Sequence, residues 1–330
     1  MRVAQAERLS GIDSVGLGEQ PDPAPGAGQA LIRVYGAGVG PWDVGFLGGG
    51  FPGIALPFVP GQEVAGLVQA TGVGAGVEPG DRVYASLFPT GGGFAELALA
   101  AADRLAPMPD QASFQEAAGL VIGAGTAHEG LVSRGVLRAG ETVLITAAAG
   151  GVGSAAVQIA SALGAHPMGV ASPPNHDYLR ALGAREVFDY HAPHWVEGVR
   201  AVAPGGVDLL LDCVGGPTGD QAVGALRDGG RVISVIPPFG PWQLERGITG
   251  ESFAAHVDRP RLEALARLVD AGQLRPQLEA VLPLGQVGEA LRRVAGRHTR
   301  GKMVLQDRAL APTPWLVARP DQLASQSPAD

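Results

Sequence analysis

The sequence has a single cysteine, Cys213, among its 330 residues. One thiol excludes an intramolecular disulfide and is too few for a zinc site built from cysteines. The chain also has no apolar run of about 18 residues, which a membrane-spanning helix requires. Its first residues, MRVAQAERLSG, contain no apolar signal core. These absences predict a cytoplasmic protein with no membrane partner.

Positive charge is scarce as well. Lysine and arginine total 24 against 32 aspartates and glutamates, a formal net charge of −8, and Lys302 is the only lysine. A chain with this balance lacks the electrostatic footprint of a nucleic-acid-binding protein. Its 46% hydrophobic and 17% charged residues are typical of a globular protein with a substantial core.

Residues suited to metal binding or nucleophilic catalysis are also few. His191 and His194 form the only close histidine pair, in a loop beside Pro193, where exposure to solvent is a simpler interpretation than metal binding. Ser154 comes nearest to a nucleophile-elbow pattern, but it falls inside a predicted helix. We therefore predict neither a metal centre nor hydrolytic catalysis.

What the chain does contain is a glycine-rich turn at residues 141–165. Residues 142–147 form an apolar run that predicts a buried parallel strand, and an alanine-rich helix follows the turn. Ala148, Gly150 and Gly153 supply the small residues of a dinucleotide fingerprint, in which backbone N–H groups at the helix start bind a pyrophosphate. The competing interpretation is a tight strand-to-helix connection without a ligand.

The surrounding pattern predicts two structural units. Residues 1–118 read as a β-rich, partly closed barrel with strands at 30–35, 63–69, 81–86 and 94–98, and residues 36–51 as a long loop between strands. Residues 119–258 read as a dinucleotide-binding domain, residues 259–306 as a return to the first unit, and residues 307–330 as a C-terminal tail.

Strands and helices alternate in the second unit, which predicts βαβ units and a parallel sheet. Ser113 and Glu116 fit a capping box that starts a helix pair over residues 113–135. After the turn we expect strands at 167–171, 186–189, 207–212 and 231–235, with helices at 177–182, around Val199 and at 221–227. In the return segment we expect a helix at 259–272, a strand at 277–283, a helix at 285–294 and a strand at 302–306.

The end of the second parallel strand, near Ala171, bears on the choice of cofactor. An acidic residue there would bind the ribose 2′-OH of NAD, and would repel a 2′-phosphate. This chain has Ser172 and Asn175 instead, which favours NADP over NAD, although Asp177 would weaken that reading if it pointed inward. The alternative for Ser172 is an ordinary helix cap.

Motifs spread over residues 24–306 resemble the zinc-free branch of the medium-chain dehydrogenase/reductase superfamily, specifically the quinone oxidoreductase (zeta-crystallin-like) family. The matching stretches are GAGVGPWD, LPFVPGQEVAGLV, GDRVYA, GTAHEGL, AAAGGVG, LLLDCVGG, GGRVISV and HTRGKMVL. The resemblance implies an α/β fold with a Rossmann dinucleotide-binding domain and a β-rich GroES-like barrel domain that close a cleft between them. It also implies a homodimer.

The resemblance further implies two sets of site residues. Catalytic positioning is expected from Gly40, Asp43, Phe51 and Thr126. Contacts with NADPH are expected from Thr126, Ala149, Gly150, Gly151, Val152, Ser172, Asn175, Tyr190, Val214, Gly215, Val235 and Lys302. Where zinc-dependent relatives carry Gly-His-Glu, this chain has Gly61, Gln62 and Glu63, which implies hydride transfer without a metal.

The chain departs from the family pattern at three places. Gly40 stands where the family usually has asparagine, Phe51 where enoyl-thioester reductases have a proton-donating tyrosine, and Asn175 where a lysine usually meets the 2′-phosphate. Reduction of a quinone or activated alkene tolerates a missing acid, because the product anion can take its proton from solvent. The alternatives are an NADPH-binding sensor or structural protein with little turnover, and an enoyl or carbonyl reductase of a biosynthetic pathway.

Overall fold

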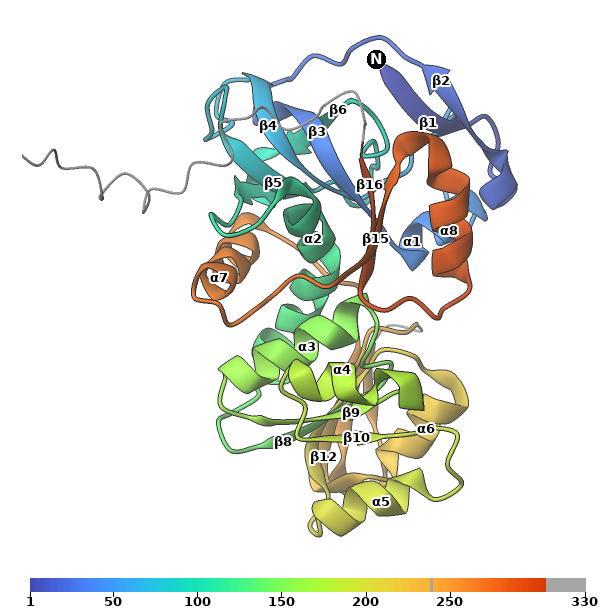
Figure 1. Cartoon of the computed structure of the whole chain (residues 1–330), viewed down its shortest axis with the longest axis vertical. Helices are drawn as coiled ribbons and strands as arrows, with labels where there is room; N and C mark the ends of the chain where they lie inside the picture. The colour runs from blue at the N-terminus through green and yellow to red at the C-terminus, as the bar shows by residue number, and fades with distance from the viewer. Residues whose placement is uncertain (238–239, 307–330) are drawn as a thin grey trace, which may run out of the picture.

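The structure, a computed structural model, describes residues 1–237 and 240–306, and Figure 1 shows them as two bodies stacked along the long axis. The upper body contains both the N-terminal third of the chain and its last strand, while the lower body contains the middle of the chain. This arrangement agrees with the expected α/β fold. The expected domain boundaries stay a prediction, and the expected tail at residues 307–330 lies outside the described residues.

The upper body is built on a mainly antiparallel sheet. Its strand order is β15 (Leu278–Pro283), β16 (Lys302–Gln306), β3 (Gln29–Val39), β4 (Glu63–Thr71), β5 (Arg82–Ser86) and β7 (Leu105–Pro107), with β6 (Leu97–Ala101) also on β3. Strands β1 (Arg2–Ala6) and β2 (Val15–Glu19) form a separate antiparallel ribbon. The β-rich unit is therefore confirmed, although the expected strand at 94–98 begins three residues later.

The expected long loop at residues 36–51 is wrong. Residues 36–39 continue β3, and α1 (Pro41–Leu47) follows directly. Pro41 occupies the first turn of the helix, where the missing N–H costs nothing. Asp43 lies three residues after Gly40 and its carboxylate accepts the Gly40 N–H, which caps the helix start. The glycines of this stretch obscured a helix that a buried carboxylate stabilises.

The helix pair expected at residues 113–135 is one continuous helix. α2 (Phe114–His128) runs without a break into a π-helical segment, Glu129–Arg134. The Ser113–Glu116 capping box is confirmed, since the Glu116 N–H donates to Ser113 Oγ and the Ser113 N–H donates to Glu116 Oε2. α2 is buried along nearly its whole length, and its many glycines and alanines let strands of the upper body and α3 (Gly151–Ala162) pack closely around it.

The lower body is a parallel sheet with one antiparallel edge. Its order is β10 (Glu186–Phe188), β9 (His166–Val170), β8 (Thr142–Ile145), β11 (Val207–Asp212), β12 (Leu226–Ser234), β14 (Thr249–Ser252) and β13 (Gly240–Gln243). Besides α3, its helices are α4 (His176–Ala181), α5 (Trp195–Val202) and α6 (Gly216–Val223). Strand order reverses between β8 and β11, and in open α/β sheets the ligand-binding crevice lies at the carboxyl ends of the strands at such a reversal.

Two expectations in this body need correction. The helix expected at 221–227 is shifted, because α6 ends at Val223 and Arg227 already lies in β12. Strands β13 and β14 were not expected at all. The glycines at 229 and 230 interrupt the apolar run that would have indicated where β12 begins.

Residues 259–306 return to the upper body and complete it. α7 (Arg259–Asp270) packs beside α2, and α8 (Val287–Ala295) packs against α1 and the end of the sheet. β16 then inserts between β15 and β3, as its central place in the sheet order shows. The last strand of the described residues is therefore an interior strand, and it pairs with β3 from the N-terminal part of the sequence.

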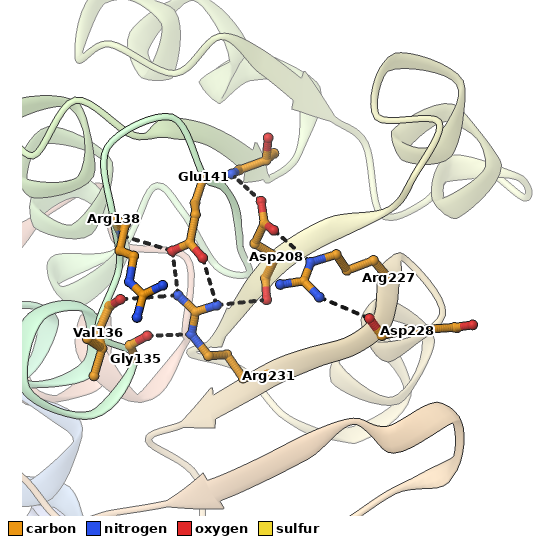
Figure 2. A network of polar contacts seen from close by, with 9 residues as sticks. Gly135, Val136, Arg138, Glu141, Asp208, Arg227, Asp228 and Arg231 are labelled. Carbon is orange, nitrogen blue, oxygen red and sulfur yellow. Dashed lines mark hydrogen bonds and ion pairs between the residues drawn. The ribbon is translucent and has the colours of Figure 1, made fainter.

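A network of charged groups fastens the amino ends of the parallel strands (Figure 2). Arg231 Nη2 lies 2.6 Å from Glu141 Oε2, and its Nη1 lies 3.2 Å from Glu141 Oε1. Arg227 Nε lies 2.7 Å from Asp208 Oδ1, and Asp208 Oδ2 also accepts the N–H of Thr142. The network links β8, β11 and β12 at their amino ends, which are opposite the crevice at their carboxyl ends.

Candidate active site

The glycine turn has the geometry that the fingerprint predicts. Gly150 is the N-cap of α3, and a Cβ built on Gly153 would lie 2.5 Å from both Ala147 O and Ala148 Cα. Gly153 is therefore required for helix and strand to pack. At Gly150 the nearest atom to such a Cβ is 3.4 Å away, which is ordinary contact. The space over Gly150 is open to a ligand at the helix N-terminus.

The turn also touches the upper body directly. Gly150 and Gly301 form a parallel bridge, and the Gly301 N–H donates to Ala149 O at 2.8 Å. A Cβ on Gly151 would lie 2.6 Å from Lys302 Cδ. The stem of Lys302 therefore lies on the turn itself.

Lys302 points into the upper body rather than toward the adenosine end of the crevice. Its ammonium group lies 2.8 Å from Val39 O and 2.5 Å from Glu63 Oε1, and Lys302 and Glu63 are both buried. The same ammonium group stands 4.5 Å from the centroid of the Trp42 ring. This pairing places Lys302 at the junction of the two bodies, and its expected contact with the adenosine phosphate stays a prediction.

Thr126 belongs to the same buried region. The other oxygen of Glu63, Oε2, accepts the N–H of Ile122 on α2 at 2.8 Å. One turn later, Thr126 Oγ1 donates to Ile122 O at 2.7 Å. Glu63 thus joins β4, β16 and the segment of α2 that carries Thr126.

Ser172, Asn175 and a residue that the sequence reasoning missed form a chain of contacts at the end of β9. Asn175 Nδ2 lies 3.1 Å from Ser172 Oγ, and Arg300 Nε donates to Asn175 Oδ1 at 2.9 Å. The Arg300 guanidinium lies 5.0 Å from the centroid of the Tyr178 ring and also donates to Pro174 O. Arg300 directly precedes Gly301 in HTRGK, but about 125 residues of sequence separate it from Asn175, so nothing local indicated the contact.

A cavity of about 340 Å³ adjoins this chain, lined by Tyr178, Gln277, Leu278, Glu279 and Arg300. Asp177, whose direction bears on cofactor choice, is fully exposed and lies 3.0 Å from Arg180. Its carboxylate is therefore turned to solvent.

Tyr190 lies two residues beyond the end of β10, and Ser172 lies two residues beyond the end of β9. Because these two strands are paired in parallel, both residues are at the carboxyl end of the sheet. His191 and His194 follow it on the surface, and His194 pairs with Glu197 at 3.4 Å. In residues 1–237 and 240–306, no group of three or more His, Cys, Asp or Glu side chains is arranged to hold a metal ion.

A buried carboxylate organises the far side of the crevice. Asp212 Oδ1 accepts the hydroxyl of Thr146 at 2.7 Å and the N–H groups of Val214 and Gly215 at 3.2 and 3.1 Å. The N–H of Val235 donates to Asp212 O at 3.0 Å. The structure therefore brings Val214, Gly215 and Val235 together around Asp212, which the sequence reasoning did not single out.

Asp43 holds two loops together on the upper side of the junction. Its carboxylate accepts the N–H of Gly40 at 2.9 Å and the N–H of Gly61 at 3.0 Å. Burial raises the pKa of Asp43 to about 7, while the two backbone hydrogen bonds and nearby Lys302 oppose that rise. With both oxygens engaged by backbone, Asp43 acts as a positioning residue.

Phe51 packs in a group of aromatic rings beside α1. Its ring is stacked on Phe46 at 3.9 Å between centroids, and Phe88 meets it edge-on at 6.4 Å. Phe51 is only partly buried, so it offers a flat apolar edge at the surface of this group.

Comparison with known proteins agrees with this geometry. The family profile for the alcohol dehydrogenase GroES-like domain matches residues 26–110, and the profile for zinc-binding dehydrogenases matches residues 182–305. Human quinone oxidoreductase is 32% identical over 298 residues, covering 86% of this chain and 90% of that protein.

Solved structures show the same arrangement. A probable oxidoreductase from Mycobacterium abscessus has a TM-score of 0.82 at 33% identity, covering 93% of this chain and 98% of the other. The quinone oxidoreductase from Coxiella burnetii has a TM-score of 0.84 at 27% identity, covering 93% and 99%.

The fold and these relatives define an oxidoreductase, of a kind that implies a nicotinamide cofactor and a small-molecule substrate. Within that class, the chain belongs to the medium-chain dehydrogenase/reductase family, with the quinone oxidoreductases as relatives over most of its length. No helix in the described part of the chain is long and apolar enough to cross a membrane.

Proposed function

We propose that this protein transfers a hydride from NADPH to a quinone or an activated alkene without a metal. The observation that carries the choice of NADPH is the Ser172–Asn175–Arg300 chain at the end of β9. A carboxylate at this place would repel a 2′-phosphate, whereas a guanidinium with an amide and a hydroxyl beside it suits one.

Different residues around the crevice suit different parts of NADPH. The open space over Gly150 at the α3 N-terminus suits the pyrophosphate, and Arg300 suits the 2′-phosphate. The loop that Asp212 holds, with Val214 and Gly215, would lie along the nucleotide. NADPH, when bound, supplies the hydride; the protein supplies position and the exclusion of water.

The proposal that no metal takes part rests on the side chains at the position where zinc-dependent relatives have ligands. Gln62 lies between Gly61 and Glu63, and an amide side chain is not among the usual zinc ligands. Glu63 is already paired with Lys302 and Ile122 N. We expect chelator-treated protein to keep its full rate.

Steady-state kinetics with NADPH and NADH against a panel of quinones and enones tests the proposal. We expect a preference for NADPH of at least about tenfold in kcat/KM, which Arg300→Gln should abolish by weakening NADPH alone. Arg180→Gln is the matched control, because it removes an exposed arginine that pairs with Asp177 outside the chain of contacts. Equal use of both cofactors by the unaltered protein would overturn the choice of NADPH.

The same panel separates the alternatives. Tight NADPH binding with no oxidation by any acceptor would identify a sensor or structural protein, and turnover confined to enoyl or carbonyl compounds would identify a biosynthetic reductase. The expected homodimer stays a prediction, which sedimentation analysis would test.

A further inference from the structure

The residue at position 40 has to be glycine because the Trp42 ring fills the adjoining space. A Cβ built on Gly40 would lie 2.1 Å from Trp42 Cζ2 and 2.2 Å from Trp42 Cε2, far inside any allowed contact. Cε2 is the ring carbon bonded to the indole nitrogen. The indole therefore occupies the place into which a side chain at position 40 would project.

Trp42 is held in that place from two directions. The carboxylate of the next residue, Asp43, fixes the backbone at Gly40, and the ammonium group of Lys302 stands 4.5 Å from the centroid of the Trp42 ring. Because Lys302 also lies on Gly151 of the glycine turn, the ring is within reach of the cofactor side of the junction.

Two side chains here have buried polar atoms that find no hydrogen-bond partner among the described residues. They are Nε1 of Trp42 and both amide atoms, Nε2 and Oε1, of Gln62. Gln62 is fully buried. A buried polar group without a partner is costly to the folded state, so such groups often mark a place where a ligand completes the bonding.

Hydrogen bonds to the backbone hold the segments that carry these two residues together. Asp43, adjacent to Trp42, accepts the N–H of Gly61, adjacent to Gln62, at 3.0 Å. The carbonyl of Gln62 in turn accepts the N–H of Leu87, next to Phe88 of the aromatic group. Trp42, in the first turn of α1, and Gln62, in the segment just before β4, are therefore joined through a single buried carboxylate, beside the aromatic group that contains Phe51.

We propose that the indole N–H of Trp42 and the amide N–H of Gln62 form a two-donor recess that receives the carbonyl oxygen of the acceptor. This inference rests on the proposed function and names the feature that the acceptor must have: a carbonyl conjugated to the carbon that accepts hydride. When hydride adds, the displaced π electrons become negative charge on that oxygen. A proton from water then gives the enol; for a quinone this is a keto tautomer of the hydroquinone, which becomes aromatic when the hydride-bearing ring carbon loses a proton to water and the second oxygen gains one. The cofactor leaves as NADP⁺.

Hydrogen-bond donors aimed at this oxygen stabilise the transition state of hydride transfer more than the bound acceptor, because the negative charge develops during the transfer. Trp42 and Gln62 are therefore acceptor-binding residues whose loss should lower kcat more than it raises KM. We expect Trp42→Phe and Gln62→Met each to lower kcat by at least about tenfold with a quinone acceptor. Trp195→Phe is the matched control, because its indole N–H donates to Gln221 in the lower body, away from the recess.

A binding measurement tests the recess without turnover. 4-Nitrophenol changes its absorbance on ionisation, and its phenolate mimics the oxygen anion formed by hydride addition. In the complex with NADP⁺, the unaltered protein should lower the pKa of bound 4-nitrophenol, and Trp195→Phe should do the same. Trp42→Phe and Gln62→Met should move that pKa back toward its value in solution while circular dichroism shows that they are folded.

The outcomes of the two experiments are distinguishable. A lowered pKa of the bound phenol that depends on both donors supports the recess even if no acceptor is reduced, in which case only the proposed function fails. Turnover of quinones by both variants at the unaltered rate, with an unchanged phenol pKa, would overturn the recess and leave the proposed function standing.

Discussion

Lys302 and Glu63, 239 residues apart in the sequence, form a buried ion pair with 2.5 Å between Nζ and Oε1. The pair joins the last strand of the chain to β4, and its two partners reach α2 through Ile122 and the glycine turn through Gly151. The only lysine of the chain therefore joins strands of the upper body, with its stem against the glycine turn of the lower body.

Removing one member of that pair should lower the free energy of unfolding more than removing both members. Lys302→Met leaves the Glu63 carboxylate buried without its cation, which should lower the free energy of unfolding by about 3–5 kcal/mol. The double variant Lys302→Met, Glu63→Leu removes both charges and should recover part of the loss. Urea titration gives both values, and a double variant less stable than the single one would contradict the assignment.

Asp43 should make stability fall as pH rises from about 4 to 7. In that range the unfolded chain, with an aspartate pKa near 3.8, has lost a proton that the folded protein keeps, because burial raises the pKa of Asp43 to about 7. Raising the pH then favours the unfolded chain, by at most about 1.4 kcal/mol per pH unit.

The comparison that isolates this effect is with Asp43→Asn, which cannot ionise. The difference in unfolding free energy between the two proteins should shift against the unaltered one as pH rises through this window, and level off above pH 7. Parallel pH curves for the two proteins would show that the Asp43 carboxyl titrates normally.

Alanine substitutions at Gly150 and Gly153 should have different effects, the first on cofactor binding and the second on packing. Gly153→Ala places a methyl group 2.5 Å from Ala147 O and should lower the melting temperature by several degrees. Gly150→Ala meets no atom closer than 3.4 Å and has a φ of −77°, so it should melt like the unaltered protein. Its methyl group would instead face the bound pyrophosphate and weaken NADPH binding by about tenfold or more.

Fluorescence titration with NADPH, alongside thermal melting, measures both effects. If Gly150→Ala bound NADPH with unchanged affinity, the pyrophosphate would have to lie elsewhere than over Gly150.

Arg231 should matter for stability and not for catalysis. Its guanidinium holds Glu141 with two hydrogen bonds at the edge of the sheet opposite the crevice (Figure 2). Arg231→Met should lower the free energy of unfolding by about 1–3 kcal/mol with kcat unchanged. Arg180→Met removes an exposed i,i+3 pair and should cost less than about 0.5 kcal/mol. Equal costs for the two variants would show that the network adds nothing beyond a surface pair.

Local signals in the sequence predicted much of the fold. The strand, glycine turn and helix at residues 142–162, the Ser113–Glu116 capping box and the final strand at 302–306 each depend on neighbouring residues, and the structure confirms them. α1 was missed because its start depends on Asp43, a buried carboxylate whose second partner, Gly61, is 18 residues away.

The candidate site was predictable to the extent that its residues share a motif. The structure gathers Val214, Gly215 and Val235 around Asp212, and their contact with the cofactor stays a prediction. Arg300 and Asp212 lie in the stretches HTRGKMVL and LLLDCVGG but were not singled out there, since their roles arise from contacts with Asn175 and Thr146 that only the folded chain creates. For the same reason the sequence did not indicate the buried pair of Lys302 with Glu63 on β4.

The most direct test of the account is a single-turnover experiment that mixes chelator-treated protein, loaded with one equivalent of NADPH, with excess quinone. The account predicts a rapid exponential loss of the nicotinamide absorbance with one equivalent of hydroquinone formed, slowed when the transferred hydrogen at C4 is replaced by deuterium. Absorbance that decays no faster than in the absence of protein, for every quinone and enone tried, would contradict it.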